Sequence, residues 1–183
     1  MRHSRNHSGK GIDLFVVEGV SIHDRLQAAA DRAVPGHWEG DLISGSANTH
    51  IATLVERKSR YTVLAKIRGK DTNSVISGIL REVGKLPATL WESITWDRGD
   101  EIADHKRLKL EKNIDVHIFD PQSPWQRGTN KTTDRLLRQY LPKKTDLSIY
   151  TQSDLNRIAK KLNQRPRKTL EYKTPADVLS RVQ

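Results

Sequence analysis

Residues 37–45, HWEGDLISG, begin the stretch of sequence that decides the fold. Two further segments follow at once, HIATLVERKS at residues 50–59 and RYTVLAKIRG at residues 60–69. Each segment is short, rich in β-branched or aromatic residues, and bounded by turn-forming residues, which is the composition of a β-strand. The connections at residues 44–48 and 58–60 are short enough for hairpins. The stretch therefore predicts three consecutive antiparallel strands.

The remainder of the chain alternates between helical and strand patterns. Residues 71–87 carry apolar side chains at helical spacing, with Asp71 as a candidate N-cap. SITWD at residues 93–97 and DVHIFD at residues 115–120 predict two short buried strands, with a polar helix over about residues 100–112 between them.

Three more helices are expected near the C-terminus. Residues 129–140 show helical spacing of apolar side chains, and residues 151–164 open with Thr151 and Asp154 at capping-box spacing. A last short helix begins after Thr174, with proline at its first position.

This order of elements predicts the α/β class, with a mixed five-stranded sheet and helices on both faces, in the ribonuclease-H-like manner. Residues 1–34 are expected to be a linker or lead-in, and residues 35–183 one domain. A chain of 183 residues is long enough for a single core.

The composition favours a nucleic-acid partner. The net charge is +10, and the chain contains no cysteine, which excludes disulfides and cysteine zinc sites. No apolar run approaches the roughly 18 residues that span a membrane, and the basic start lacks the apolar region of a secretory signal. We therefore expect a cytoplasmic protein.

Two aspartates stand where a metal site for phosphodiester chemistry would need them. Asp41 lies within an apolar strand, and Asp97 ends the strand at residues 93–97. Such chemistry uses two divalent ions about 4 Å apart, held by carboxylates from separate elements. Alternatively, Asp41 is an ordinary half-exposed strand residue and Asp97 is the N-cap of the following helix.

A third acid is expected early in the helix over residues 129–140, and that position is occupied by Lys131. A protonated lysine cannot bind a cation and repels one nearby. Asp134, three residues on, and Glu101, after the second strand aspartate, are the candidate replacement acids. Asp134 lies about 4.5 Å further along the helix axis, a large displacement for this chemistry.

The quoted segments carry a family resemblance. PGHWEGDLISG, HIATLVERKSRYTVLAKIRGK, TWDRGDEIADH, DPQSPWQRGTN and LNQRPRKTLEYKTPADVL resemble the catalytic domain of bacterial insertion-sequence transposases of the IS-thirty type. That family belongs to the DDE superfamily with retroviral integrases and has a ribonuclease-H-like fold. The resemblance runs from about residue 21 to the C-terminus.

The resemblance implies a DNA-cutting and DNA-joining enzyme. Asp41 and Asp97 would be the first two catalytic, metal-binding acids, with Mg²⁺ or Mn²⁺ in a two-metal site. The partners would be DNA, as element ends and target, and further copies of the chain in a homo-oligomer, with no membrane and no small-molecule cofactor. The family has its catalytic glutamate where this chain has Lys131, so we expect impaired activity. The family's N-terminal helix-turn-helix would be represented here only by a trailing linker in residues 1–20.

Basic and aromatic side chains near these acids are candidate DNA contacts, because cations bind phosphates and aromatic rings stack on bases. They are Arg98, Trp125, Arg127, Arg135 and Arg138. The alternative for charged clusters is a solvated surface, and Trp125 would then anchor its loop to the core.

Three functions remain open from the sequence. The first is an active DDE transposase core, and the second is a catalytically inactive DNA-binding or dimerising domain of the same ancestry. The third is an unrelated basic nucleic-acid-binding module, which the length of the matching motifs disfavours.

Overall fold

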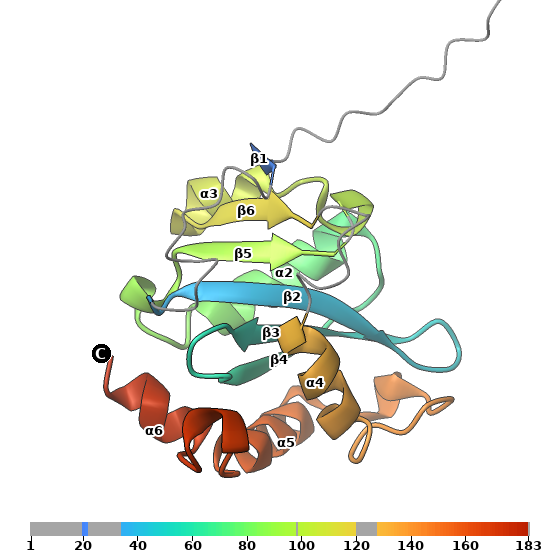
Figure 1. Ribbon diagram of the computed structural model, residues 1–183. Coiled ribbons are helices and arrows are strands. Elements are labelled where there is room, and N and C mark those ends of the chain that lie inside the picture. Colours follow the sequence, from blue (N-terminus) through green and yellow to red (C-terminus); the bar gives the residue numbers. More distant parts are fainter. Residues whose placement is uncertain (1–19, 22–33, 98, 120–127, 183) are drawn as a thin grey trace, which may run out of the picture.

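The computed structural model describes residues 20–21, 34–97, 99–119 and 128–182. Its strands form one sheet in the order β1-β6-β5-β2-β3-β4 (Figure 1). The strands are β1 Val20–Ser21, β2 His37–Ser44, β3 His50–Glu56, β4 Thr62–Lys66, β5 Ser93–Trp96 and β6 Asp115–Ile118. Strands β2, β3 and β4 pair antiparallel, whereas β5 pairs parallel with β2 and β6, and β1 pairs parallel with β6. The predicted mixed sheet of five strands is confirmed, and the two-residue β1 adds a sixth strand at one edge.

The helices are α2 Thr72–Val83, α3 Lys106–Lys112, α4 Gly128–Leu137, α5 Gln152–Asn163 and α6 Pro175–Ser180. Local capping explains where three of them begin. The Asp71 side chain accepts a hydrogen bond from the amide of Ser74, and capping boxes open α5 at Thr151 and α6 at Thr174. These three starts agree with the sequence prediction.

The helix predicted over about residues 100–112 is confirmed only in its second half. The chain instead forms a 3₁₀ turn at Gly99–Ile102 and then the separate helix α3. Ile102 and Leu108 are both fully buried in the same hydrophobic cluster. Six residues correspond to about 240° around an α-helix, so one unbroken helix would not turn both side chains into that core.

Each face of the sheet is covered by helices (Figure 1). Trp38, Ile94 and Trp96 pack with residues of α2 and α3 in one cluster. Ile43, on the other face of β2, belongs to a second cluster with residues of α4 and α5. Side chains alternate between faces along a strand, so Asp41 lies on the same face as Ile43, beneath α4. No helix among the described residues has the length and apolar composition needed to cross a membrane.

A close contact fixes the pairing of β2 with β5. Gly40 is aligned with Trp96, and a Cβ placed on Gly40 would lie 2.2 Å from the Trp96 ring. Only glycine leaves room for the indole at this point. The indole Nε1 donates to Glu101 Oε2 at 3.2 Å, which holds the ring in place.

The outer edge of β4 is closed by side-chain amides of α5. Asn163 accepts from the Thr62 amide at 2.8 Å and donates to the Thr62 carbonyl at 2.9 Å. Gln152 accepts from the Lys66 amide at 2.8 Å and donates to the Leu64 carbonyl at 2.7 Å. Backbone groups that an edge strand would otherwise offer to another strand are therefore occupied.

Replacing Gly40 with alanine is expected to destabilise the fold by about 1–3 kcal/mol, because the new methyl group displaces the buried Trp96 ring. Urea unfolding followed by tryptophan fluorescence measures the change. Gly84→Ala is the matched control, since its Cβ would meet only ordinary contacts at 3.8 Å and beyond. Equal stability of the Gly40→Ala and Gly84→Ala variants would show that the Trp96 contact does not fix the register.

Candidate active site

Asp41 projects from the middle of β2 on the face beneath α4. Its side chain is half-buried, and its Oδ1 accepts a hydrogen bond from the Leu42 amide at 2.8 Å. The neighbouring strand contributes Thr53, whose hydroxyl donates to the Asp41 carbonyl at 3.2 Å. Asp41 is therefore held by its own strand and by β3, with no ion pair among the described residues.

Asp97 lies one residue beyond β5. The register aligns Glu39 with Thr95 and Gly40 with Trp96, so its continuation brings Asp97 beside Asp41. The two aspartates predicted from the sequence thus come together from adjacent parallel strands.

The surroundings of Asp41 disfavour its charged form and raise its pKa to about 7. Burial is the largest cause, and the Leu42 amide opposes it. Repulsion from Asp134, Asp97 and Glu101 adds to the increase, in that order. Three other carboxylates are therefore close enough to act on Asp41.

Asp134 comes from α4 and is half-buried. Its Oδ1 is buried and has no hydrogen-bond partner among the described residues. Burial raises the pKa of Asp134 to about 6, and the charge of Arg138 opposes this increase. A buried carboxylate oxygen without a donor is costly, which is the condition in which a cation would be stabilising.

Lys131 and Glu101 differ from Asp134 in their settings. The Lys131 side chain is exposed on α4. Glu101 is half-buried, already accepts the Trp96 indole N–H, and is the last of the charges that raise the pKa of Asp41. Of the two replacement acids considered from the sequence, Asp134 therefore acts more strongly on Asp41.

The predicted DNA contacts are only partly described. Arg98, Trp125 and Arg127 lie outside the described residues. Arg135 is exposed on α4, and Arg138 donates to the Leu141 carbonyl at 3.4 Å and to the Ser44 carbonyl at 3.3 Å. Arg138 thus ties the end of α4 to the end of β2.

A buried ion pair lies next to Asp41, with one partner on the same strand, and it was not predicted from the sequence. Glu39 is two residues before Asp41, on the same face of β2, and is fully buried. Arg57 Nη1 lies 2.6 Å from Glu39 Oε1 and is itself 4% exposed. The signal in the sequence was the second acid at strand spacing, Glu39 with Asp41, followed by an arginine after the next strand.

The donor chemistry suits a hard divalent cation. Mg²⁺ prefers carboxylate oxygens and is often held by one or two of them with waters and substrate phosphates. Asp41 and Asp97 offer such a pair, and the unsatisfied Asp134 Oδ1 lies on the element packed above them. The described residues do not bring three His, Asp or Glu side chains close enough to hold a metal between them. The fit therefore rests on the Asp41–Asp97 pair.

Comparison with known proteins shows what the chain as a whole is similar to. Transposase InsI for insertion sequence element IS30A of Escherichia coli (strain K12) is 50% identical over 183 residues, which cover 99% of this chain and 48% of that protein. The chain is a homologue of the IS30-family transposases. The transposase for insertion sequence element IS1086 of Cupriavidus metallidurans is 48% identical over 164 residues, 89% of this chain and 48% of that protein.

This IS30-family homologue spans about half the length of the curated relatives it matches. No protein-family model matches it. Among solved structures, the catalytic core domain of BIV integrase aligns with a TM-score of 0.59 at 18% identity, covering 79% of this chain and 93% of that chain. A chain of the simian T-cell lymphotropic virus intasome in complex with the PP2A regulatory subunit B56 gamma aligns with a TM-score of 0.62 at 19% identity, covering 78% and 53%. The fold is that of an integrase catalytic core, as the resemblance implied.

Replacing Asp41 with asparagine in this chain is expected to raise the free energy of unfolding by about 2 kcal/mol at pH 8 in EDTA. The folded-state pKa of Asp41, about 7, lies above its ordinary 3.8. The folded chain therefore binds the extra proton between these values, and its stability falls as the pH rises from about 4 to about 7. Asparagine removes that loss, so its advantage should vanish near pH 4.

Urea unfolding across this pH range measures the difference. Asp154→Asn is the opposite-sign control, because hydrogen bonds from Thr151 lower the pKa of Asp154 to about 2 and make its charged form favourable. If the Asp41→Asn variant is less stable than the unchanged chain at pH 8, burial and the neighbouring carboxylates do not raise the pKa of Asp41.

Proposed function

We propose that this chain is the catalytic domain of a DDE transposase that cuts DNA strands and joins them to target DNA. One observation carries the proposal: Asp41 and Asp97 lie side by side on adjacent parallel strands, with the acid-bearing helix α4 packed above β2. Homology to IS30-family transposases over nearly the whole chain supports it. The substrates would be element ends and target DNA in the bacterial cytoplasm, and the active form would be a homo-oligomer.

Asp41 and Asp97 would hold Mg²⁺ or Mn²⁺. When bound, such an ion activates an oxygen nucleophile and stabilises the leaving oxygen of a phosphodiester. The chain's own residues provide the setting. Burial of Asp41 and repulsion from its neighbours favour its protonated form, so cation binding must release that proton and should strengthen as the pH rises toward about 7.

The third acid distinguishes this chain from the family pattern. Lys131 occupies the expected glutamate position and is exposed, so it supplies no ligand. Asp134 lies three residues further along α4, and its charge raises the pKa of Asp41. Its Oδ1 is buried without a hydrogen bond among the described residues. Asp134 does not form a three-acid group with Asp41 and Asp97 among the described residues. We therefore infer that it substitutes only weakly and that the chain keeps reduced activity. Losing one ligand and placing a cation nearby both weaken the hold on metal ions.

A second function has a specific observation in its favour. Lys131 stands where the family resemblance implies a catalytic glutamate, and a DNA-binding or dimerising domain without catalysis would tolerate that reversal of charge. The two functions differ in whether the carboxylates are needed for any reaction on DNA.

Strand transfer of a pre-cleaved DNA end, with Mg²⁺ or Mn²⁺, tests the proposal. Asp41→Asn and Asp97→Asn should each lower the rate at least roughly 100-fold, which corresponds to about 3 kcal/mol of barrier. Asp134→Asn should lower the residual rate at least roughly tenfold, and Lys131→Glu should raise the rate of the unchanged chain by a similar factor. Asp104→Asn, an exposed aspartate beyond the 3₁₀ turn, is the matched control and should leave the rate unchanged.

The outcomes separate the functions. Joining that survives both Asp41→Asn and Asp97→Asn would reject the assigned acids. If neither the unchanged chain nor the Lys131→Glu variant joins DNA, yet both bind it, the result would favour the non-catalytic domain.

A further inference from the structure

A cavity lies against α4, on a different side of the helix from Asp134. This cavity of about 370 Å³ is formed by the turn between β3 and β4, by α4, and by the segment that follows α5. Its cationic lining consists of Arg60, Arg135, Arg165, Arg167 and Lys168. The described residues that line it include no aspartate or glutamate. Five positive charges from three separate segments therefore converge on one space.

The charged form of Arg167 is disfavoured in this lining. Its side chain is half-buried, and its Nε is buried with no hydrogen-bond partner among the described residues. Burial, and then the nearby charge of Arg165, lower the pKa of the Arg167 guanidinium. An oxyanion bound in the cavity would offset the charge that Arg165 and Arg167 bring together there.

Hydroxyl groups complete the lining. Thr129, Thr132, Thr133 and Thr169 also line the cavity, and Arg60 Nη1 donates to Thr129 Oγ1 at 2.6 Å. This last contact joins the β3–β4 turn to the start of α4. Arginine and threonine side chains are common donors to phosphate oxygens in protein–DNA complexes.

The position of the cavity relates it to the candidate active site. Thr129, Thr132 and Thr133 line it from α4, and the same helix carries Asp134 toward Asp41. The helix therefore stands between the cavity and the carboxylates, with residues of both on its surface.

We propose that the cavity lined by Arg60, Arg135, Arg165, Arg167 and Lys168 binds a backbone phosphate of the DNA, at a distance from the phosphodiester that reacts at Asp41 and Asp97. The site positions DNA by charge and does not read its sequence. This inference rests on the proposed function, because it takes DNA as the substrate.

Binding of a short fluorescein-labelled duplex, followed by anisotropy in EDTA at several salt concentrations, tests the inference. The double variant Arg135→Gln with Arg165→Gln removes two exposed charges from the cavity. It should bind roughly tenfold more weakly at 0.1 M salt, and the slope of log K against log salt should become shallower by about 1.

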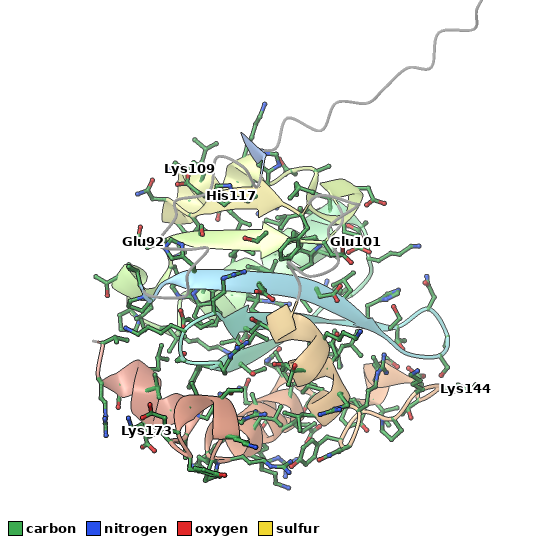
Figure 2. All side chains as sticks on the ribbon, viewed as in Figure 1. Glu92, Glu101, Lys109, His117, Lys144 and Lys173 are labelled. Atoms are coloured by element: carbon green, nitrogen blue, oxygen red, sulfur yellow. The ribbon has the colours of Figure 1, made fainter. Side chains whose placement is uncertain are left out.

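Lys109→Gln with Lys112→Gln is the matched control. It removes the same charge from two exposed positions on α3, of which Lys109 is labelled in Figure 2. Helix α3 packs on the opposite face of the sheet. Both double variants alter exposed side chains, and thermal unfolding should confirm that each is folded. The change in log K caused by the control should be less than half of the change caused by the cavity variant.

The readout is independent of catalysis. The Asp41→Asn variant should bind DNA in EDTA at least as well as the unchanged chain, so a failure of the assigned acids would not disturb the cavity result. Equal loss of affinity in both double variants would overturn the inference and leave the strand-transfer results standing. Failure of the unchanged chain to bind the duplex at low salt would overturn it as well.

Inorganic phosphate distinguishes a free anion from a DNA phosphate. In one outcome, millimolar phosphate stabilises the unchanged chain but not the cavity variant, and the two bind DNA with equal affinity. That outcome would assign the cavity to a free anion and overturn the DNA assignment. Loss of DNA affinity in the cavity variant alone supports the inference.

Discussion

The pairing of β2 with β5 is the constraint on which the site depends. These strands run parallel, and the Trp96 ring occupies the space that a side chain at position 40 would need. A slip of one residue would turn Asp41 toward the face of α2 and α3 and would bury a carboxylate among Trp38, Ile94 and their neighbours. The contact between a glycine and an indole on one face thereby determines that two aspartates meet on the other.

The face beneath α4 contains two kinds of buried acid. Glu39 is fully buried and is compensated by Arg57, and removing one partner of such a pair is strongly destabilising. Asp41 and Asp134 are less buried, lack ion pairs among the described residues, and have raised pKa values. The fold thus compensates the charge of Glu39 and disfavours the charged forms of Asp41 and Asp134. This contrast is consistent with a structural role for Glu39 and with the role proposed for the other two acids.

Much of the fold was predictable because its signals are local. Strand composition indicated the first three strands, and the caps at Asp71, Thr151 and Thr174 indicated three helix starts. Asp41 and Asp97 were predictable because they interrupt or end apolar strands. The Glu39–Arg57 pair, the action of Asp134 on Asp41 and the basic cavity were not, because each depends on how distant segments pack. The break before α3 was missed because Ile102 and Leu108 reach the core from different elements. Arg98, Trp125 and Arg127 lie outside the described residues, and their roles stay predictions.

The amide groups of Asn163 and Gln152 have a consequence for how copies of the chain assemble. They occupy backbone groups of β4 at the sheet's outer edge, and the opposite edge is the two-residue β1. A neighbouring molecule could extend the sheet at β4 only after α5 had moved away and exposed part of the second hydrophobic cluster. The proposed homo-oligomer would therefore join through helices and loops, with the sheet a separate unit within each copy.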